Sequence, residues 1–447
     1  MSHISDLLRN HGVDLSWQES LYQDLHEHPE LSGFETETSR TILSQLNRFD
    51  CEVISPVGGY GVIAIFRNGD HENHPVALMR ADFDGLPVKE TTGVPWASTR
   101  IRPLDGTNVP VMHACGHDMH TTALLGACAL LDERRDAWQG TFIALFQPSE
   151  ENARGANAMI ADGLAQKIPR PDVCFSQHVV PGPAGAVMSR PGAALAACDS
   201  IDIRIRGRSA HGSMPHNSID PTYVAAMIVV RLQGIVGREV SPEEFAVISV
   251  GTLQSGNSNN TIPSEARLVL NCRFYNDKVK KRIYRAIERV VKGECMASGI
   301  EHEPVIEYFA HGELTDNDVD VFAKVRPVFD EVFGPESVTA DRWTASEDFP
   351  NIPLALNSPY LYWTIGATPA GDWARAVAAD RVAQDVPANH MGDFLPDFEP
   401  TVKSATTAAA AAVLTYLGAR PRPKPKLSGK PDGPHPRDAG DTGHLAF

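Results

Sequence analysis

Three short apolar runs, each ending in acidic or histidine residues, constrain the fold of this chain more than any other feature. They are PVALMRADFD, GTFIALFQPSEE and PDVCFSQH, at residues 75–84, 140–151 and 171–178. Continuous apolar runs with helical stretches between them are typical of buried parallel strands in an α/β sheet. Because the carboxyl ends of such strands form the binding crevice, the polar residues that end the runs are expected to converge. These residues are Asp82, Asp84, Glu150, Glu151 and His178.

Residues 197–310 have a different pattern. SIDIRIRG alternates like a half-exposed strand, and a helical stretch, two strands, an amphipathic helix and a last strand follow it. The order β-α-β-β-α-β is that of the ferredoxin-like split unit. Because the strand-like YLYWTIG and an alanine-rich helix come afterwards, we predict that this α+β domain is inserted in an α/β domain. The α/β domain then comprises residues 1–196 and 311–418, with a mostly parallel central sheet flanked by helices.

Charge and composition exclude several classes of protein. The net charge of −16 argues against a nucleic-acid partner, which requires a basic face. No run reaches the roughly 18 apolar residues of a membrane span, and residues 1–20 lack the apolar core of a secretory signal. The seven scattered cysteines are no disulfide framework, so we expect a cytoplasmic protein. Residues 419–447 are rich in proline, glycine and charge, which predicts a disordered tail.

The stretch HACGHDMH at 113–120 places three histidines and one cysteine within eight residues. His113, Cys115 and His117 are spaced so that an extended segment would direct all three to one side, and a helix is expected to begin directly after them. Thiolate and imidazole are preferred donors for a borderline-soft divalent ion such as zinc. From this stretch alone, a nucleophilic cysteine beside a histidine and a packed core remain open alternatives.

Two adjacent carboxylates follow one of the apolar runs. Glu150 and Glu151 would repel each other unless a cation holds them. A metal would give them different tasks, because one carboxylate could coordinate while the other takes a proton from water. The residues themselves do not decide which glutamate has which task. Together with Cys115, His117 and His178, they indicate a metal site assembled from distant segments.

Several stretches of the chain match one family. They are LHEHPELSGFETETS, MRADFDGLPVKE, HACGHDMHTTALLGA, FQPSEENARGANAMIADG, GRSAHGSMPHNSIDP, NTIP and SEDF. The chain resembles the aminoacylase and carboxypeptidase family of metallopeptidases, in its hippurate hydrolase and auxin-conjugate amidohydrolase branch. The match covers nearly the whole chain except the tail, and the cysteine-containing motif is specific to this branch. The α/β domain is accordingly expected to be the catalytic domain.

The resemblance implies two divalent metal ions, zinc or manganese, with cobalt as a third candidate. Cys115 would bridge the ions as a thiolate. Glu150 would be the general base and acid, and Asp82 would orient a ligand. The branch usually has Ser-Pro and Asp-Glu after the last ligand, whereas the stretch here is NHMGDFLPDFEP. The implied ligands are Cys115, His117, Glu151, His178 and His390.

The resemblance also assigns tasks to the inserted domain. This domain would serve as a lid and as the contact of a homodimer. His211 would reach an active site, often that of the neighbouring subunit, to stabilise the oxyanion. Asn260 and Arg273 would contact the substrate. The implied reaction is hydrolysis of an N-acyl amino acid, or a similar small amide, by a metal-activated water. Alternatives are a dipeptidase or aminopeptidase using the same site, a cysteine-nucleophile amidase, and a non-catalytic metal-binding homologue.

Overall fold

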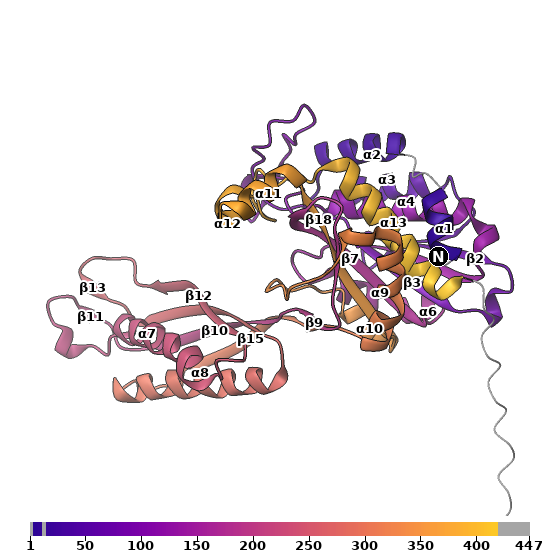
Figure 1. Cartoon of the computed structure of the whole chain (residues 1–447). Helices are drawn as coiled ribbons and strands as arrows, with labels where there is room; N and C mark the ends of the chain where they lie inside the picture. The colour runs from indigo at the N-terminus through magenta and orange to yellow at the C-terminus, as the bar shows by residue number, and fades with distance from the viewer. Residues whose placement is uncertain (1–2, 11–14, 419–447) are drawn as a thin grey trace, which may run out of the picture.

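The computed structural model describes residues 3–10 and 15–418 and is organised around a mixed eight-stranded sheet (Figure 1). The predicted tail at 419–447 lies outside the described residues. In spatial order the strands are β1 (Glu52–Val57), β2 (Gly61–Asn68), β6 (Gly140–Gln147), β3 (Val76–Asp82), β7 (Val173–Pro183), β18 (Tyr360–Thr368), β8 (Val187–Ser189) and β17 (Ser337–Thr339).

The parallel part of this sheet is its centre, formed by β6, β3, β7 and β18. The neighbouring pairs β1–β2, β2–β6 and β18–β8 are antiparallel, whereas the edge pair β8–β17 is parallel. The predicted mostly parallel sheet is therefore corrected to a mixed one. The cause is local, because only a few residues join β1 to β2, and so short a connection allows an antiparallel hairpin but no parallel crossover.

Helices cover both faces of the sheet, which explains the continuous apolar runs. Along β2, Val62, Ala64 and Phe66 enter one core, whereas Ile63 and Ile65 enter the other. The first core is covered by α1 (His3–Asn10), α2 (Leu15–Glu27), α3 (Thr36–Leu46), α4 (His117–Glu133), α9 (Val319–Phe333) and α13 (Phe398–Leu417). The second is covered by α5 (Gly155–Ala161), α6 (Leu164–Lys167) and α10 (Asn351–Leu356).

The alanine-rich helix α13 packs within the first core. Its alanines from Ala408 to Ala412 are fully buried, and their small side chains allow a close approach to α4. None of the helices in the described part of the chain combines the length and apolarity that crossing a bilayer requires.

Residues 197–312 build a separate four-stranded antiparallel sheet that extends away from the eight-stranded sheet (Figure 1). In chain order its elements are β10 (Ala197–Arg206), α7 (Pro221–Glu239), β12 (Ala246–Ser255), β14 (Glu265–Phe274), α8 (Asp277–Ala297) and β15 (Val305–Gly312), and the sheet order is β12-β14-β10-β15. Alternate residues of β14, from Ala266 to Phe274, pack against α7 and α8.

Short elements complete the described fold. The small strand pairs are β4 (Ile101–Leu104) with β5 (Thr107–Pro110), β9 (Gly192–Leu195) with β16 (Thr315–Asn317), and β11 (Ala210–His211) with β13 (Thr261–Ile262). Two helices follow β18 and precede His390, namely α11 (Ala370–Ala378) and α12 (Val382–Asp385).

Candidate functional site

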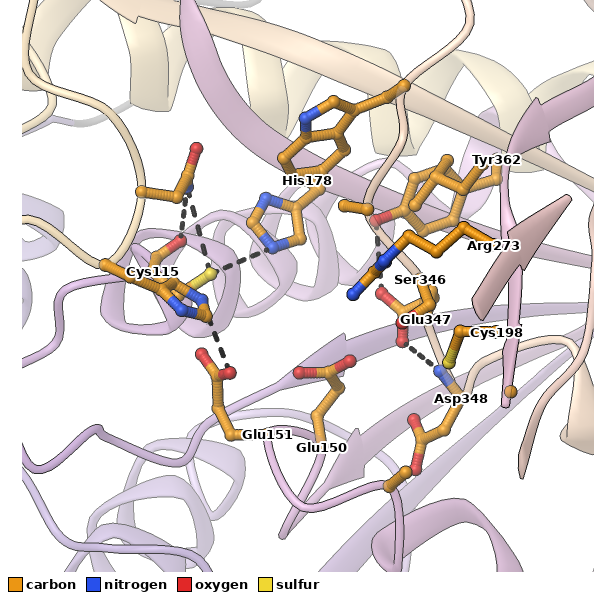
Figure 2. Close-up of a pocket in the computed structure, with 17 residues that line it drawn as sticks. Cys115, Glu150, Glu151, His178, Cys198, Arg273, Ser346, Glu347, Asp348 and Tyr362 are labelled. Atoms are coloured by element: carbon orange, nitrogen blue, oxygen red, sulfur yellow. Dashed lines mark hydrogen bonds and ion pairs between the residues drawn. The ribbon is translucent and has the colours of Figure 1, made fainter. Parts of the chain in front are cut away.

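A cavity of about 380 Å³ lies at the carboxyl ends of the central strands, between the two sheet units. Figure 2 shows Cys115, Glu150, Glu151 and His178 turned toward a shared space. From the four-stranded unit, Cys198, Arg273 and Gly312 also line the cavity. The convergence expected at the strand ends is therefore present. The remaining lining residues include Leu195, Trp343, Glu347, Asp348, Tyr362, Asn389 and His390.

Cys115 lies at the centre of the potential metal ligands. Its sulfur is 3.4 Å from Nε2 of His178. Potential ligand atoms of Cys115, His117 and His178 lie within 4.8 Å of one another, and the same holds for Cys115, Glu151 and His390. Glu151 is 3.4 Å from Nε2 of His390 and 3.8 Å from Nε2 of His117. One sulfur thus belongs to two separate ligand groups, which is the geometry that a bridging ligand requires.

The junction before α4 depends on Gly116. Its φ is +82°, a left-handed backbone conformation that residues other than glycine rarely adopt. A Cβ atom at this position would lie 2.3 Å from Cγ2 of Val179. The turn therefore requires glycine, and it brings Cys115 and His117 from consecutive elements into one group of potential metal ligands.

Asp84 orients His117. The Nδ1 atom of His117 donates to Oδ1 of Asp84 at 3.1 Å, which leaves Nε2 to face Glu151. The other oxygen of Asp84 accepts hydrogen bonds from Ser32 and from the backbone N–H of Glu151. Asp84 was expected to converge on the crevice with the other residues that end the apolar runs, but no role was predicted for it. Its spacing of two from Asp82 was the available signal, because alternate residues of an extended segment share a side.

Asp82, the predicted orienting residue, lies next to the same cluster. Its Oδ2 is 3.6 Å from Nε2 of His117, and its Oδ1 accepts a hydrogen bond from Nδ1 of His120 at 2.5 Å. Nε2 of His120 in turn accepts the backbone N–H of Val179 at 2.9 Å. Through His120, Asp82 is therefore linked to β7 at Val179, the residue after His178.

The site residues have strongly altered acidities. Burial raises the pKa of the Cys115 thiol well above its ordinary value, and the carboxylates of Glu151 and Glu150 raise it further. Burial lowers the pKa of His178, which keeps its imidazole neutral and able to coordinate. For His117 burial opposes protonation, but Asp82, Asp84 and Glu151 raise its pKa to about 10. The surroundings therefore favour positive charge beside this imidazole.

These residues fit divalent metal ions. Among the residues that the structure describes, Nε2 of His117 and Oε1 of Glu151 are buried without a hydrogen-bond partner, and they face each other at 3.8 Å. A buried acceptor without a partner costs free energy that a bound cation would offset. A cation would also allow the buried Cys115 to ionise, because a coordinated thiol loses its proton. The donors are sulfur, imidazole and carboxylate, the set that zinc accepts.

Glu150 lies beside this cluster and faces a second group of acids. A ligand atom of Glu150 lies within 4.8 Å of atoms in Glu347 and Asp348. Burial, Glu347, Glu151 and Asp348 raise the pKa of Glu150 well above its ordinary value. Glu150 is therefore disposed to hold a proton inside the cavity.

A buried arginine holds the acids behind Glu150. Arg80 is fully buried and lies 2.7 Å from Asp82, 2.9 Å from Glu347 and 3.1 Å from Asp348. The hydroxyl of Tyr362 donates to Glu347 at 3.1 Å. The motif SEDF was recognised in the sequence, but these roles were not predicted, since no spacing links residues 347–348 to residue 80.

Of the three residues predicted to contribute from the inserted segment, one lines the cavity and two lie away from it. Arg273 lines the cavity and donates to the carbonyl of Thr344 at 2.8 Å. Within the described part of the chain, His211 and Asn260 do not line it. His211 is exposed, contacts Ser213 at 2.8 Å, and lies on β11 at the far end of the four-stranded unit (Figure 1). Asn260 is its neighbour, because its carbonyl accepts the N–H of Gly212.

Comparisons with known proteins agree with this arrangement. Residues 78–380 match the model of Peptidase family M20/M25/M40. The chain is 34% identical to the N-acetylcysteine deacetylase of Bacillus subtilis over 332 residues, which are 74% of this chain and 83% of the relative. It is 34% identical to the hippurate hydrolase of Campylobacter jejuni over 334 residues, with the same coverage. Among solved structures it is similar to the Bacillus subtilis YXEP protein, described as a dinuclear metal binding peptidase of the M20 family, with a TM-score of 0.70, 27% identity, and coverage of 90% of this chain and 98% of that one.

Proposed function

The chain belongs to peptidase family M20/M25/M40, and on this premise we propose that its substrate is an N-acyl amino acid, which it cleaves into a carboxylic acid and an amino acid. As a member of this family it is a metal-dependent amidohydrolase. The observation that carries the proposal is the position of Glu150, a half-buried carboxyl beside two ligand groups that share Cys115. This arrangement supports the role of Glu150 as a proton acceptor next to the site of water activation.

Cys115 would hold both ions, one together with His117 and His178 and the other together with Glu151 and His390. When bound, divalent ions supply Lewis acidity that polarises the amide carbonyl and lowers the pKa of water. We infer zinc or manganese, with cobalt as the next candidate, because the ligands combine sulfur, imidazole and carboxylate. His390 has a φ of +71° and donates its backbone N–H to the carbonyl of Ala114. This bond supports its approach to Glu151 in spite of the altered sequence around it.

Glu150 would act in both proton transfers, first as the general base and then as the general acid. It takes a proton from the attacking water and returns it to the leaving nitrogen, a role that typically contributes ~10²–10⁴ in rate. Its burial among Glu347, Glu151 and Asp348 supports this role, because the proton is retained between the two steps. Arg273 enters the cavity from the four-stranded unit and is suited to the carboxylate of the amino acid.

We further propose a homodimer formed through residues 197–310, a unit with ferredoxin-like topology that would act as a lid. The outer face of α7 exposes Tyr223 and Val230 by 60% and 67%. A Cβ atom at Gly234 or Gly237 of the same helix would meet nothing within 4 Å. This face thus combines exposed apolar side chains with glycines, and the edge strand β12 continues it. A second copy of the chain could bury such a surface. His211 of that copy would then donate to the carbonyl oxygen as negative charge develops, with Asn260 beside it.

A cysteine-nucleophile amidase is disfavoured by the same site. Burial and two glutamates raise the pKa of Cys115, whereas a nucleophilic cysteine requires a lowered one. All seven cysteines lie within the described residues and are free, which supports our placement of the protein in the reducing cytoplasm.

Metal removal tests the proposed function. The chain is treated with a chelator, dialysed, and reconstituted with zinc, manganese or cobalt before assay on N-acyl amino acids and dipeptides. We expect the metal-free protein to be inactive and hydrolysis of N-acyl amino acids to return with at least one ion. Undiminished turnover after verified metal removal, combined with inactivation by thiol alkylation, would instead establish the cysteine-nucleophile mechanism. A preference for dipeptides would change the proposed substrate class.

A further inference from the structure

The turn that carries Glu150 and Glu151 has an unusual backbone conformation. It joins β6 to α5, and Ser149, directly before Glu150, has a φ of +54°. Residues other than glycine rarely adopt this left-handed conformation, and they keep it only where surrounding contacts enforce it. Ser149 is buried, so its backbone N–H and hydroxyl find their partners inside the protein. These partners therefore control the direction in which the turn presents Glu150.

One carboxylate oxygen binds both groups of Ser149. Oε1 of Glu35 accepts hydrogen bonds from the backbone N–H of Ser149 at 2.7 Å and from its hydroxyl at 2.9 Å. Glu35 is fully buried and comes from a distant part of the chain, at the start of α3. The carbonyl of Ser149 accepts the N–H groups of Arg154 and Gly155, which close the turn. Glu35 thus holds the residue at which the turn begins.

The place of Glu35 in the chain would suggest a different task. Glu35 occupies the N-cap position of α3, where a side chain commonly accepts the first N–H groups of the helix, yet it makes no such bond. Glu30 makes these bonds instead, because its Oε2 accepts the N–H groups of Glu37 and Thr38 and the hydroxyl of Thr38 at 2.8 to 3.0 Å. The carboxylate of Glu35 is therefore committed to Ser149 and not to its own helix.

A second carboxylate holds the residue after Glu150. The backbone N–H of Glu151 donates to Oδ2 of Asp84 at 3.0 Å. Two buried carboxylates, Glu35 and Asp84, thus bind the backbone immediately before and immediately after Glu150. Because Asp84 holds the backbone of Glu151, loss of the contact from Glu35 should displace Glu150 and leave the ligand group of Glu151 in place.

We propose that Glu35 is a positioning residue for proton transfer, because it holds Ser149 in the left-handed conformation that presents the Glu150 carboxyl to the cavity. This role rests on the proposed function, in which Glu150 moves the proton. Without an acceptor at residue 35, the N–H and hydroxyl of Ser149 would be buried without partners, and the turn would rearrange to regain them. A displacement of about 1 Å at a reacting group can cost ~10²-fold in rate.

Replacing Glu35 with leucine and with glutamine tests this role. Leucine keeps most of the volume and removes the acceptor, whereas glutamine removes the charge and keeps an acceptor oxygen. In the metal-loaded full chain, assayed on N-acetylglycine and N-benzoylglycine, we expect Glu35→Leu to lower kcat ~10- to 100-fold with KM and bound metal nearly unchanged. Glu35→Gln should keep kcat close to that of the wild type. Adding Ser149→Gly to Glu35→Leu should recover part of the lost kcat, since glycine adopts a positive φ without steric cost.

Glu30→Leu is the matched control. It removes a buried carboxylate from the same segment, and this carboxylate also accepts backbone N–H and hydroxyl groups, but at the start of α3 and not at the turn. It should lower the urea midpoint as Glu35→Leu does, while kcat stays near the wild-type value. If Glu35→Leu is too unstable to purify, Glu35→Asp should show the same loss of kcat at smaller size, because aspartate is too short to reach Ser149 in the same geometry.

Hydrogen exchange measured by mass spectrometry reports on the turn without catalysis. Amides in residues 146–155 should exchange faster in Glu35→Leu and at the wild-type rate in Glu30→Leu and Glu35→Gln. Wild-type exchange and kcat in Glu35→Leu, or an equal loss of kcat in Glu30→Leu, would overturn the role of Glu35 and leave the proposed function intact. Faster exchange in Glu35→Leu, in a protein whose wild type hydrolyses no N-acyl amino acid with any restored ion, would contradict the proposed function and support the hold of Glu35 on the turn.

Discussion

Replacing Glu150 with glutamine tests the division of labour between two adjacent glutamates. The change preserves size and removes only the ability to accept and return a proton. Glu150 is surrounded by Glu151, Glu347 and Asp348, and its pKa is well above the ordinary value, first because it is buried and then because of these carboxylates. If it carries the proton between water and leaving nitrogen, kcat should fall ~10²–10⁴-fold.

Metal content provides the discriminating control. Glu151 is 3.4 Å from Nε2 of His390 and 3.8 Å from Nε2 of His117, so Glu151→Gln should reduce the bound metal measured by elemental analysis after dialysis. Glu150→Gln should retain it. The two variants therefore make the same chemical change one residue apart and should lose activity for different reasons.

Unfolding by urea tests whether Glu150→Gln remains folded. A carboxyl whose pKa is raised in the folded state stabilises the protein below its ordinary pKa, and this contribution is lost as pH rises toward the raised value. At neutral pH, ionisation of Glu150 therefore lowers the free energy of unfolding of the metal-free wild type, and glutamine has no such cost. The variant should unfold at an equal or higher urea concentration than the wild type. A variant that keeps more than a tenth of the wild-type kcat, or that loses metal as Glu151→Gln does, would refute the assigned role.

Three other expectations concern stability and assembly. Glu35 is buried, and burial and then Asp84 raise its pKa from 4.5 to about 7. The wild type should therefore lose roughly 3 kcal/mol of unfolding free energy relative to Glu35→Gln as pH rises through 7. If urea unfolding gives the same difference between the two proteins at pH 5 and at pH 8, this expectation is wrong. Arg80→Met should cost about 3–5 kcal/mol of unfolding free energy, because it leaves buried acids without a cation, whereas Arg381→Met, at the exposed pair with Asp385, should leave it nearly unchanged. Mixing His211→Ala with Glu150→Gln should restore roughly a quarter of wild-type activity if subunits exchange and His211 acts across a dimer, and no recovery would exclude that arrangement.

The framework of the site could be predicted because it depends on local patterns. Strands buried on both faces require continuous apolar runs, and the catalytic candidates follow two of those runs directly. His178 shows the limit of this reasoning. It lies within β7, which continues to Pro183, because pairing with the distant β18 extends the strand. Such pairing is a tertiary property that the run PDVCFSQH does not contain.

The remaining parts of the site depend on contacts between distant segments. Asp82 and Asp84 share a side of the extended chain, so the sequence does not tell which histidine each one binds. The position of α4 decides this, because Asp84 accepts a hydrogen bond from Nδ1 of His117 and Asp82 accepts one from Nδ1 of His120. Arg80 appears in the sequence as an interruption of an apolar strand. Its burial makes sense only once Glu347 and Asp348, far along the chain, supply the opposite charges.

His211 limits what one copy of the chain can do. It is exposed on β11, at the end of the four-stranded unit farthest from the eight-stranded sheet (Figure 1), whereas Arg273 from the same unit lines the cavity. Both belong to one continuous sheet-and-helix unit, so a rotation that brought His211 to its own cavity would displace Arg273 from it. If both residues contact one substrate, they must come from different copies. The exposed apolar face of α7 is where the second copy would bind, and mixing the two inactive variants tests whether it does. Recovery of activity would show that each active site is completed by His211 of the neighbouring subunit.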